Sequence, residues 1–329
     1  MGAIDGRQFA DHIVGMSDSG NPPFEEYLEA KVEVDDASLH QKTFERFTSL
    51  LSTIDSPRIL DVGTGTGAMI RRLLGIQLKG DAIIQGLDTE STSLQRAKML
   101  IGTQLRQTGG EINEDEGQIV SIENELRKTI QFLKGDFLSK SIRESLITIP
   151  YHCITANAFM DLVPPNEAVH IVSDLLVPGG IFYTTINYDG ITSLFPSYGD
   201  ASFENELLSI YNDSMDKRER AGLPVGGSRT GSRIYNILID RGFVIEGFGA
   251  SDWSVFPWDG RYAGSEALLL RRIVQNIYRE AKEEGKKKSQ RDQNREQLNR
   301  WLEDRMDRIS TGELALVVHQ TDLLSRMSA

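Results

Sequence analysis

Short apolar runs alternate with amphipathic helical patterns between about residues 57 and 187. This alternation is typical of βαβ units, in which helices join the parallel strands of one sheet. The runs that read as strands are rich in Ile, Leu, Val and aromatic residues, and most are followed by apolar positions at three- and four-residue spacing. The expected strands of this region are 58–62, 82–88, 129–134, 151–156 and 181–187.

The segments between these strands predict helices and one loop. Helical patterns follow the first strand, cover about 92–105 after capping-box spacing, and run from 165 to 175 before a Pro-Gly-Gly turn. Residues 107–117 are rich in acidic side chains, and we expect an exposed loop there.

The pattern changes after Tyr188. Residues 190–228 are interrupted by Pro, Ser and Gly and hold one helical pattern near 203–218. Beyond them the alternation resumes with a helix at 232–241, a strand at 243–249, a strongly helical segment at 264–308, and a last strand near 314–318 beside the strand at 243–249.

These patterns predict a doubly wound, mostly parallel seven-stranded α/β sheet with helices on both faces. The N-terminus and the insertions should form a largely helical cap. The expected division of the chain is a helical lid at 1–50, a core at 51–250 with a cap insertion at about 190–228, a helical insert at 251–310, and a final strand and tail at 311–329.

Charge and composition narrow the class of protein. The 329 residues include 36 basic and 48 acidic side chains, and the net charge of −12 argues against a nucleic-acid partner. The single cysteine, Cys153, forbids an internal disulfide and fits a reducing compartment. No apolar run approaches the roughly 18 residues of a bilayer span. We therefore expect a cytoplasmic protein that acts on a small molecule, with its helical segments as the candidate homodimer surface.

The most informative segment is the glycine turn at 61–68, Asp-Val-Gly-Thr-Gly-Thr-Gly-Ala. Glycines allow a sharp turn and a close approach of ligand to main chain, and the following helix offers unpaired N–H groups. Read with Ala68, the segment fits the G-x-G-x-x-G/A dinucleotide fingerprint; read with Gly67, it is a G-x-G-x-G turn after a strand-end acid. Asp88 ends the second strand, where a carboxylate can accept two hydrogen bonds from a ribose diol.

This turn resembles that of the class I (Rossmann-like) S-adenosylmethionine-dependent methyltransferases. Three later segments extend the resemblance. Residues 134–137, Lys-Gly-Asp-Phe, are similar to the family's adenine site; residues 155–162 are similar to its strand-four segment, with Asn157 where Asp is more frequent; residues 176–182 match the start of its strand five. The resemblance covers about 57–187 well and 230–249 loosely.

The resemblance implies S-adenosyl-L-methionine as cofactor, S-adenosyl-L-homocysteine as product, and an acceptor pocket above strands four and five. Tyr27, in the expected lid, is a further candidate contact. The implied cofactor-binding residues are Asp61, Gly63, Thr64, Gly65, Gly67, Asp88, Thr89, Asp136, Phe137, Asn157 and Ala158. The candidate catalytic residues are Asp161 and Tyr188, and the candidate substrate-binding residues are Phe159, Asn187, Arg229 and Trp253.

Several alternatives remain open. Arg229 is otherwise a surface group beside a helix N-cap, and the aromatic segment around Trp253 otherwise pins the helical insert to the sheet. The predicted reaction, methyl transfer to an O, N or C acceptor, needs mainly the alignment of donor and acceptor and the exclusion of water. We expect no metal site, because no His, Cys and carboxylate cluster has coordinating spacing. The competing functions are an NAD(P)-dependent oxidoreductase and a non-catalytic scaffold that uses its helical tail for a partner.

Overall fold

A ten-stranded sheet organises the part of the chain that the computed structural model describes, residues 24–108, 111–115, 118–123, 125–287 and 292–328. The strand order is β10-β12-β7-β6-β1-β2-β5-β4-β3, and β11 pairs with β12. The bounds are β1 Arg58–Val62, β2 Ala82–Asp88, β3 Glu111–Asp115, β4 Gln118–Glu123, β5 Leu126–Lys134, β6 Tyr151–Asn157, β7 Leu176–Phe195, β10 Phe243–Ala250, β11 Trp253–Val255 and β12 Ala315–Met327.

Five central strands, β5, β2, β1, β6 and β7, are parallel. Their carboxyl ends therefore meet at one edge of the sheet, and the predicted mostly parallel, doubly wound α/β architecture is confirmed. The predicted number of seven strands is wrong, since the described residues form ten, with the β3–β4 hairpin and β11 as the additional strands. β12 runs antiparallel between β7 and β10. The predicted last strand, 314–318, does not lie beside β10: Leu316–Val318 pair with β7 and β11, and only the continuation of the strand from Thr321 pairs with β10.

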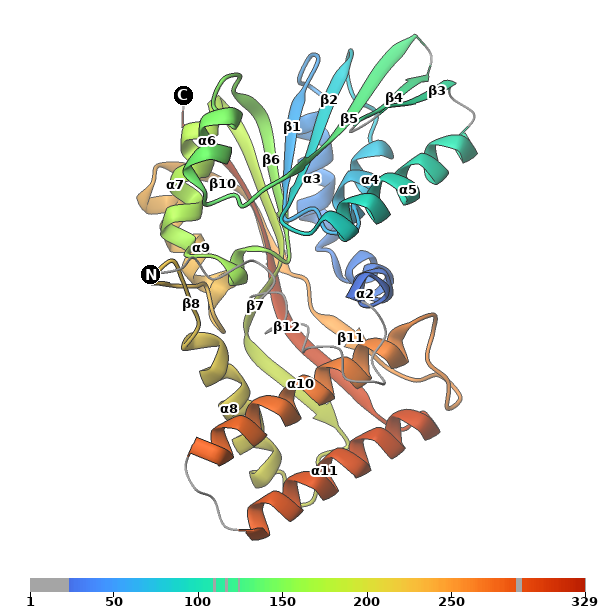
Figure 1. Cartoon of the computed structure of the whole chain (residues 1–329), viewed down its shortest axis with the longest axis vertical. Helices are drawn as coiled ribbons and strands as arrows, with labels where there is room; N and C mark the ends of the chain where they lie inside the picture. The colour runs from blue at the N-terminus through green and yellow to red at the C-terminus, as the bar shows by residue number, and fades with distance from the viewer. Residues whose placement is uncertain (1–23, 109–110, 116–117, 124, 288–291, 329) are drawn as a thin grey trace.

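Helices cover both faces of this sheet (Figure 1). One face packs against the two helices that contain Val169 (α7) and Ile234 (α9). The other face packs against the three helices that contain Phe47 (α3), Ile70 (α4) and Ile101 (α5). The bounds are α2 Phe24–Ser38, α3 Gln41–Leu51, α4 Ala68–Leu74, α5 Ser91–Thr108, α6 Lys140–Leu146, η1 Met160–Leu162, α7 Pro165–Leu175, α8 Ser202–Asp216, α9 Thr230–Asp240, α10 Glu266–Lys287 and α11 Asp292–Thr311. None of these helices is both long and apolar enough to cross a membrane.

The prediction of an exposed acidic loop at 107–117 is wrong. Within this region and just after it, β3 and β4 form an antiparallel hairpin on the edge of β5. Ile112 packs on the core beneath the sheet, and Ile119 is fully buried there. The acids around Ile112 hid this period-two pattern, since only one face of an edge hairpin needs to be apolar. Residues 109–110 and 116–117 lie outside the described residues.

β7 is longer than the predicted strand at 181–187 and continues to Phe195. Beside it, β12 extends over 13 residues. The second half of β7 (from Ile186) and the first half of β12 (to Gln320), which we call the distal strands, leave the parallel sheet. They form a second apolar core with α8, α10 and α11. In Figure 1 these three helices lie around the lower part of β7 and β12.

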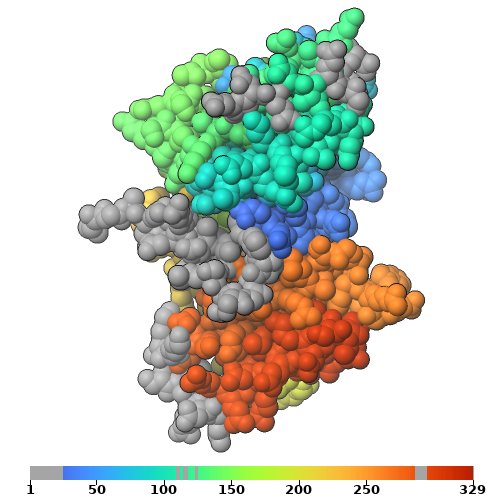
Figure 2. Space-filling model, turned by 45° about the vertical axis from the view of Figure 1, so that its right-hand side comes forward, coloured from blue at the N-terminus to red at the C-terminus, as the bar shows by residue number. Residues whose placement is uncertain are grey.

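The N-terminal helices α2 and α3 lie between the sheet and this second core. Figure 2 shows the N-terminal helices (blue) between the sheet lobe and the lower helices (orange and red). α3 packs on β10 and β12, whereas α2 contacts α10 and β11. A small hairpin, β8 Glu219–Arg220 with β9 Leu223–Pro224, follows α8.

Candidate functional site

The glycine turn after β1 is bare main chain of left-handed conformation. Gly63, Gly65 and Gly67 have φ values of 66°, 51° and 81°, a region that only glycine adopts without steric cost. A Cβ on Gly63 would lie 2.3 Å from the ring of Phe159, and one on Gly65 would lie 3.3 Å from Leu28 of α2. The turn therefore fits closely between the end of β6 and α2.

Asp61 supports this turn from behind. Its carboxylate is 1% exposed and accepts hydrogen bonds from Thr64 Oγ1 at 2.6 Å and Thr155 Oγ1 at 2.7 Å. Burial raises the pKa of Asp61 to about 6, although both hydroxyls oppose that shift. These bonds tie the turn to β6 and place Asp61 beneath the turn.

Asp88 presents its carboxylate at the end of β2. Oδ2 accepts from the backbone N–H of Gly65 at 2.8 Å, and Oδ1 accepts from the backbone N–H of Glu90 at 2.9 Å. Burial raises the pKa of Asp88. Each oxygen has capacity for another donor, so the two oxygens together can accept from two adjacent hydroxyl groups.

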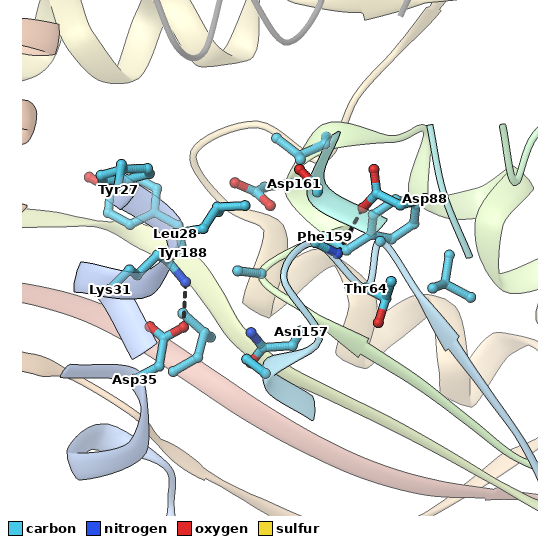
Figure 3. Close-up of a pocket in the computed structure, with 18 of the residues that line it drawn as sticks. Tyr27, Leu28, Lys31, Asp35, Thr64, Asp88, Asn157, Phe159, Asp161 and Tyr188 are labelled. Carbon is cyan, nitrogen blue, oxygen red and sulfur yellow. Dashed lines mark hydrogen bonds and ion pairs between the residues drawn. The ribbon is translucent and has the colours of Figure 1, made fainter. Parts of the chain in front are cut away.

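A cavity of about 320 Å³ opens over these strand ends. Figure 3 shows residues of α2 on one side of it and the strand-end residues Asp88 and Phe159 on the other. The structure brings most of the predicted site residues to its wall: Gly63, Thr64, Gly65, Asp88, Thr89, Asp136, Phe137, Asn157, Ala158, Phe159, Asp161, Tyr188 and Trp253.

Four predicted site residues lie outside that wall. Asp61 is beneath the turn, and Gly67 is the N-cap of α4 and lies against Ala97 and Ile101 of α5. Asn187 is buried in the sheet, where its amide donates to the carbonyl of Thr321 at 2.9 Å and accepts from Thr184.

Arg229 precedes α9 and lies against Gly190, with a backbone bridge to Asp189. Its guanidinium is thus directed at the bend of β7. The structure therefore places Asn187 and Arg229 away from the position that the sequence interpretation gave them as substrate contacts.

The cavity has two parts. We call the first the sheet half; it comprises the strand-end residues 63–65, 88–90, 135–137 and 157–159. We call the second the cap half, which comes from α2, η1, the distal strands, α8, β11 and α10. Its principal residues are Tyr27, Lys31, Asp35, Asp161, Ile186, Tyr188, Tyr211, Met215, Arg218, Trp253, Ile273 and Gln320.

An ion pair and an indole hold one wall of the cap half. Lys31 Nζ lies 2.5 Å from Asp35 Oδ2, and Trp253 Nε1 donates to Asp35 Oδ1 at 2.9 Å. Lys31 Nζ also lies 5.2 Å from the centre of the Trp253 ring. Trp253 thus both lines the cavity and joins β11 to α2, so the two sequence-based interpretations of this aromatic segment are compatible.

Tyr188 is held as a neutral phenol. Its hydroxyl donates to Asn212 Oδ1 at 2.7 Å and lies 3.0 Å from Thr192 Oγ1. Burial raises the pKa of Tyr188 to about 12. At neutral pH this side chain can therefore position a ligand but does not act as a base.

Ile186 turns into the cavity through an irregularity of β7. Its φ is 58°, which β-branched residues rarely adopt. Asp322 of β12 fixes this conformation, since its carboxylate accepts from the N–H groups of Ile186 and His40, both at 2.9 Å. This is local backbone strain of the kind that clusters at binding sites.

The sheet half and the small β8–β9 hairpin are linked by an ion pair. Arg220 Nη2 lies 2.8 Å from Asp136 Oδ1, and both residues line the cavity. Across the ranges that the structure describes, no group of three His, Cys, Asp or Glu side chains is placed to hold a metal ion.

Sequence reasoning missed most of the cap half. Tyr27, Asp161, Tyr188 and Trp253 were candidate contacts. Lys31, Tyr211 and Gln320 carried no signal, because they come from segments almost 300 residues apart that meet only in the folded chain. The clearest indication of the cap half in the sequence was the density of aromatic residues around Trp253.

Comparison with protein-family models and with curated proteins gives no match. Among solved structures, the chain is similar to a putative sarcosine dimethylglycine methyltransferase from Galdieria sulphuraria, with 16% identity, a TM-score of 0.45, and coverage of 98% of this chain and 97% of that chain. It is also similar to a SAM-dependent methyltransferase from Geobacter sulfurreducens in complex with S-adenosyl-L-homocysteine, with 12% identity, a TM-score of 0.41, and coverage of 97% of each chain. A third, a SAM-dependent methyltransferase from Methanosarcina mazei, has 11% identity, a TM-score of 0.42, and coverage of 84% of this chain and 95% of that chain. These identities are too low to transfer an activity to this chain.

Proposed function

We propose that this chain is an S-adenosyl-L-methionine-dependent methyltransferase that acts on a small molecule enclosed in the cavity. The observation that carries the proposal is the placement of the Asp88 carboxylate and the bare glycine turn on one cavity wall, at the carboxyl ends of parallel strands. Ligands of open α/β sheets bind at that edge.

The residues of the sheet half fit the parts of this cofactor. Asp88 would accept from the ribose hydroxyls, and Asp136 with Phe137 would hold the adenine. The main chain around Gly63 and Gly65, with Asn157 and Ala158 opposite, would hold the amino-acid part. When bound, the cofactor supplies a methyl group activated by a sulfonium.

The cap half contributes alignment and exclusion of water. Its buried aromatic and apolar residues surround the place where an acceptor would meet the strand ends. Asp161 and Tyr188 are the polar groups we assign to acceptor contact, with Tyr188 as a positioning group because its hydroxyl proton is held by Asn212. Water exclusion strengthens each of these polar contacts.

Two features favour this cofactor over a nicotinamide dinucleotide. Leu28 covers Gly65 with an apolar side chain, where a diphosphate would need room and charge. The basic side chains of the cavity wall already face carboxylates: Lys31 with Asp35, Arg218 with Glu280, and Arg220 with Asp136. A cytoplasmic location, the exclusion of nucleic acid and a homodimer through helical segments stay predictions.

Calorimetry on the full-length chain tests the proposal. We expect S-adenosyl-L-homocysteine to bind in the micromolar range and NAD to give no heat. Asp88→Ala should weaken that binding by more than about tenfold, since it removes a charged acceptor. The control is Asp174→Ala on α7, a half-exposed carboxylate that faces His170 and is not part of the cavity wall. An isotherm with NAD and none with S-adenosyl-L-homocysteine would reverse the assignment.

A further inference from the structure

The cap half contains buried acceptor atoms without a hydrogen-bond partner. Asp161 Oδ1 and Gln320 Oε1 are both buried, and neither has a partner among the described residues. An unpaired buried acceptor costs about 1–3 kcal/mol, and folded proteins pair nearly all such groups. A ligand that brings hydrogen-bond donors would satisfy both atoms.

Asp161 is directed into the cavity. Figure 3 shows its carboxylate in the space between Tyr27 of α2 and Asp88 of the sheet half. Burial raises the pKa of Asp161, and a hydrogen bond from its own backbone N–H, followed by the positive charges of Lys31 and Arg218, opposes that shift only in part. The Asp161 carboxylate is thus buried and accepts from its own backbone N–H, while its Oδ1 atom has no partner among the described residues.

The basic groups near Asp161 are held by other acids. Lys31 pairs with Asp35 at 2.5 Å, and Arg218 lies 3.7 Å from Glu280 of α10. Moving either cation to Asp161 would break an existing pair. The counter-charge of Asp161 is therefore left to the ligand.

Aromatic rings complete this part of the wall. Tyr27, Tyr188, Tyr211 and Trp253 line the cap half. Burial raises the pKa values of Tyr27 and Tyr211, so both stay neutral phenols. Neutral aromatic rings attract cations through their π faces. The Trp253 and Tyr27 rings already face Lys31 and Arg272, so the second preference for positive charge comes from Tyr188 and Tyr211.

We propose that the cap half binds the protonated amino group of the methyl acceptor, with Asp161 as its counter-charge and Gln320 as a second acceptor. The ligand's identity as a methyl acceptor rests on the proposed function, whereas its charge rests on the cap half alone. Asp161 also receives the amine's proton: an N–H bond breaks, an O–H bond to the carboxylate forms, and the nitrogen keeps the lone pair that it needs as a nucleophile.

Three probes of one shape and different charge test this proposal. They are 2-phenylethylammonium, 2-phenylethanol and phenylacetate, titrated calorimetrically into the full-length chain at pH 7, with and without S-adenosyl-L-homocysteine. We expect the ammonium to bind at least about tenfold more tightly than the alcohol, the gain typical of a charge-assisted hydrogen bond. Phenylacetate should bind most weakly.

Two variants assign that preference to the carboxylate. Asp161→Asn should bring the ratio of ammonium to alcohol affinity to about one, whereas the control Asp174→Asn on α7 should leave the ratio unchanged. If Asp161→Asn does not fold, Gln320→Leu is used instead, and it should lower the ammonium affinity by a few fold and leave the alcohol nearly unchanged.

The proposal is overturned if the ammonium fails to bind, if the alcohol binds equally well, or if Asp161→Asn keeps the charge preference. Failure of the methyltransferase assignment looks different. In that case S-adenosyl-L-homocysteine gives no heat, while the preference for the ammonium persists in its absence.

Discussion

Polar groups are held differently in the two halves of the cavity. In the sheet half, Asp88 accepts from two backbone N–H groups, and Asp61 beneath it accepts from two threonine hydroxyls. In the cap half, Asp161 Oδ1 and Gln320 Oε1 have no partner within the described residues. The first half is thus fixed by the protein itself, whereas the second is completed by a ligand. Preorganisation of this kind reduces the cost of binding, and we expect the sheet half to bind its ligand first.

Gly63→Ala should have the largest effect on this contrast, because it damages the sheet half directly. The left-handed φ costs about 1–2 kcal/mol for a residue with a Cβ. The contact with Phe159 adds about 1–3 kcal/mol of overpacking. We expect urea denaturation to show a loss of about 2–5 kcal/mol and S-adenosyl-L-homocysteine binding to disappear.

Gly242→Ala is the matched control for this substitution. Gly242 has a φ of 80° and nothing within 4 Å of an added Cβ. Only the backbone cost should remain, and ligand binding should be normal. Equal behaviour of the two variants would mean that the close fit of the turn against Phe159 is not needed.

Asp61→Asn tests whether the buried acid beneath the turn is held protonated at moderately acidic pH. The folded pKa is raised to about 6 from 3.8. Between those values the unfolded carboxyl ionises while the folded one keeps its proton, so stability falls as pH rises through that window. The contribution is up to about 3 kcal/mol. Denaturation at pH 4 and pH 7 should show a smaller fall in the variant than in the wild type, and identical falls would contradict this account.

Arg220→Gln should have the smallest effect, because it only loosens the connection between the sheet half and the β8–β9 hairpin. The pair with Asp136 is partly exposed, so the free energy of unfolding should change by less than about 1 kcal/mol. We expect dissociation of S-adenosyl-L-homocysteine to become a few fold faster in stopped-flow measurements. Lys79→Gln, at an exposed pair with Asp55, is the control, and an equal change in both variants would remove the proposed link.

The sequence was sufficient to predict the sheet half because its residues follow local rules. A strand, a turn that needs positive φ, and a helix occur within about a dozen residues, and parallel strands bring successive carboxyl ends to one edge. The sequence could therefore name Asp88, Asp136 and Asn157 as candidate cofactor-binding residues before their spatial neighbours were known. Asp161 was reached in the same way, from its place just after β6.

The cap half could not be predicted in this way. Lys31, Tyr211 and Gln320 lie on elements whose contacts depend on the long extension of β7 and β12. That extension was missed because Pro, Ser and Gly interrupt the pattern after Tyr188. The chain bends near Gly190, where φ is 89°, and remains paired with β12. Asn187 lies within the sheet, where it bonds to Thr184 and Thr321, and Arg229 precedes α9 and lies against Gly190.

A crystal structure of the full-length chain with S-adenosyl-L-homocysteine tests the central claim most directly. The ribose hydroxyls should lie within about 3 Å of the Asp88 carboxylate, with the adenine beside Asp136 and Phe137 and the cap half open for an acceptor. A ligand bound elsewhere, or a dinucleotide whose diphosphate displaces Leu28 from Gly65, would contradict the account.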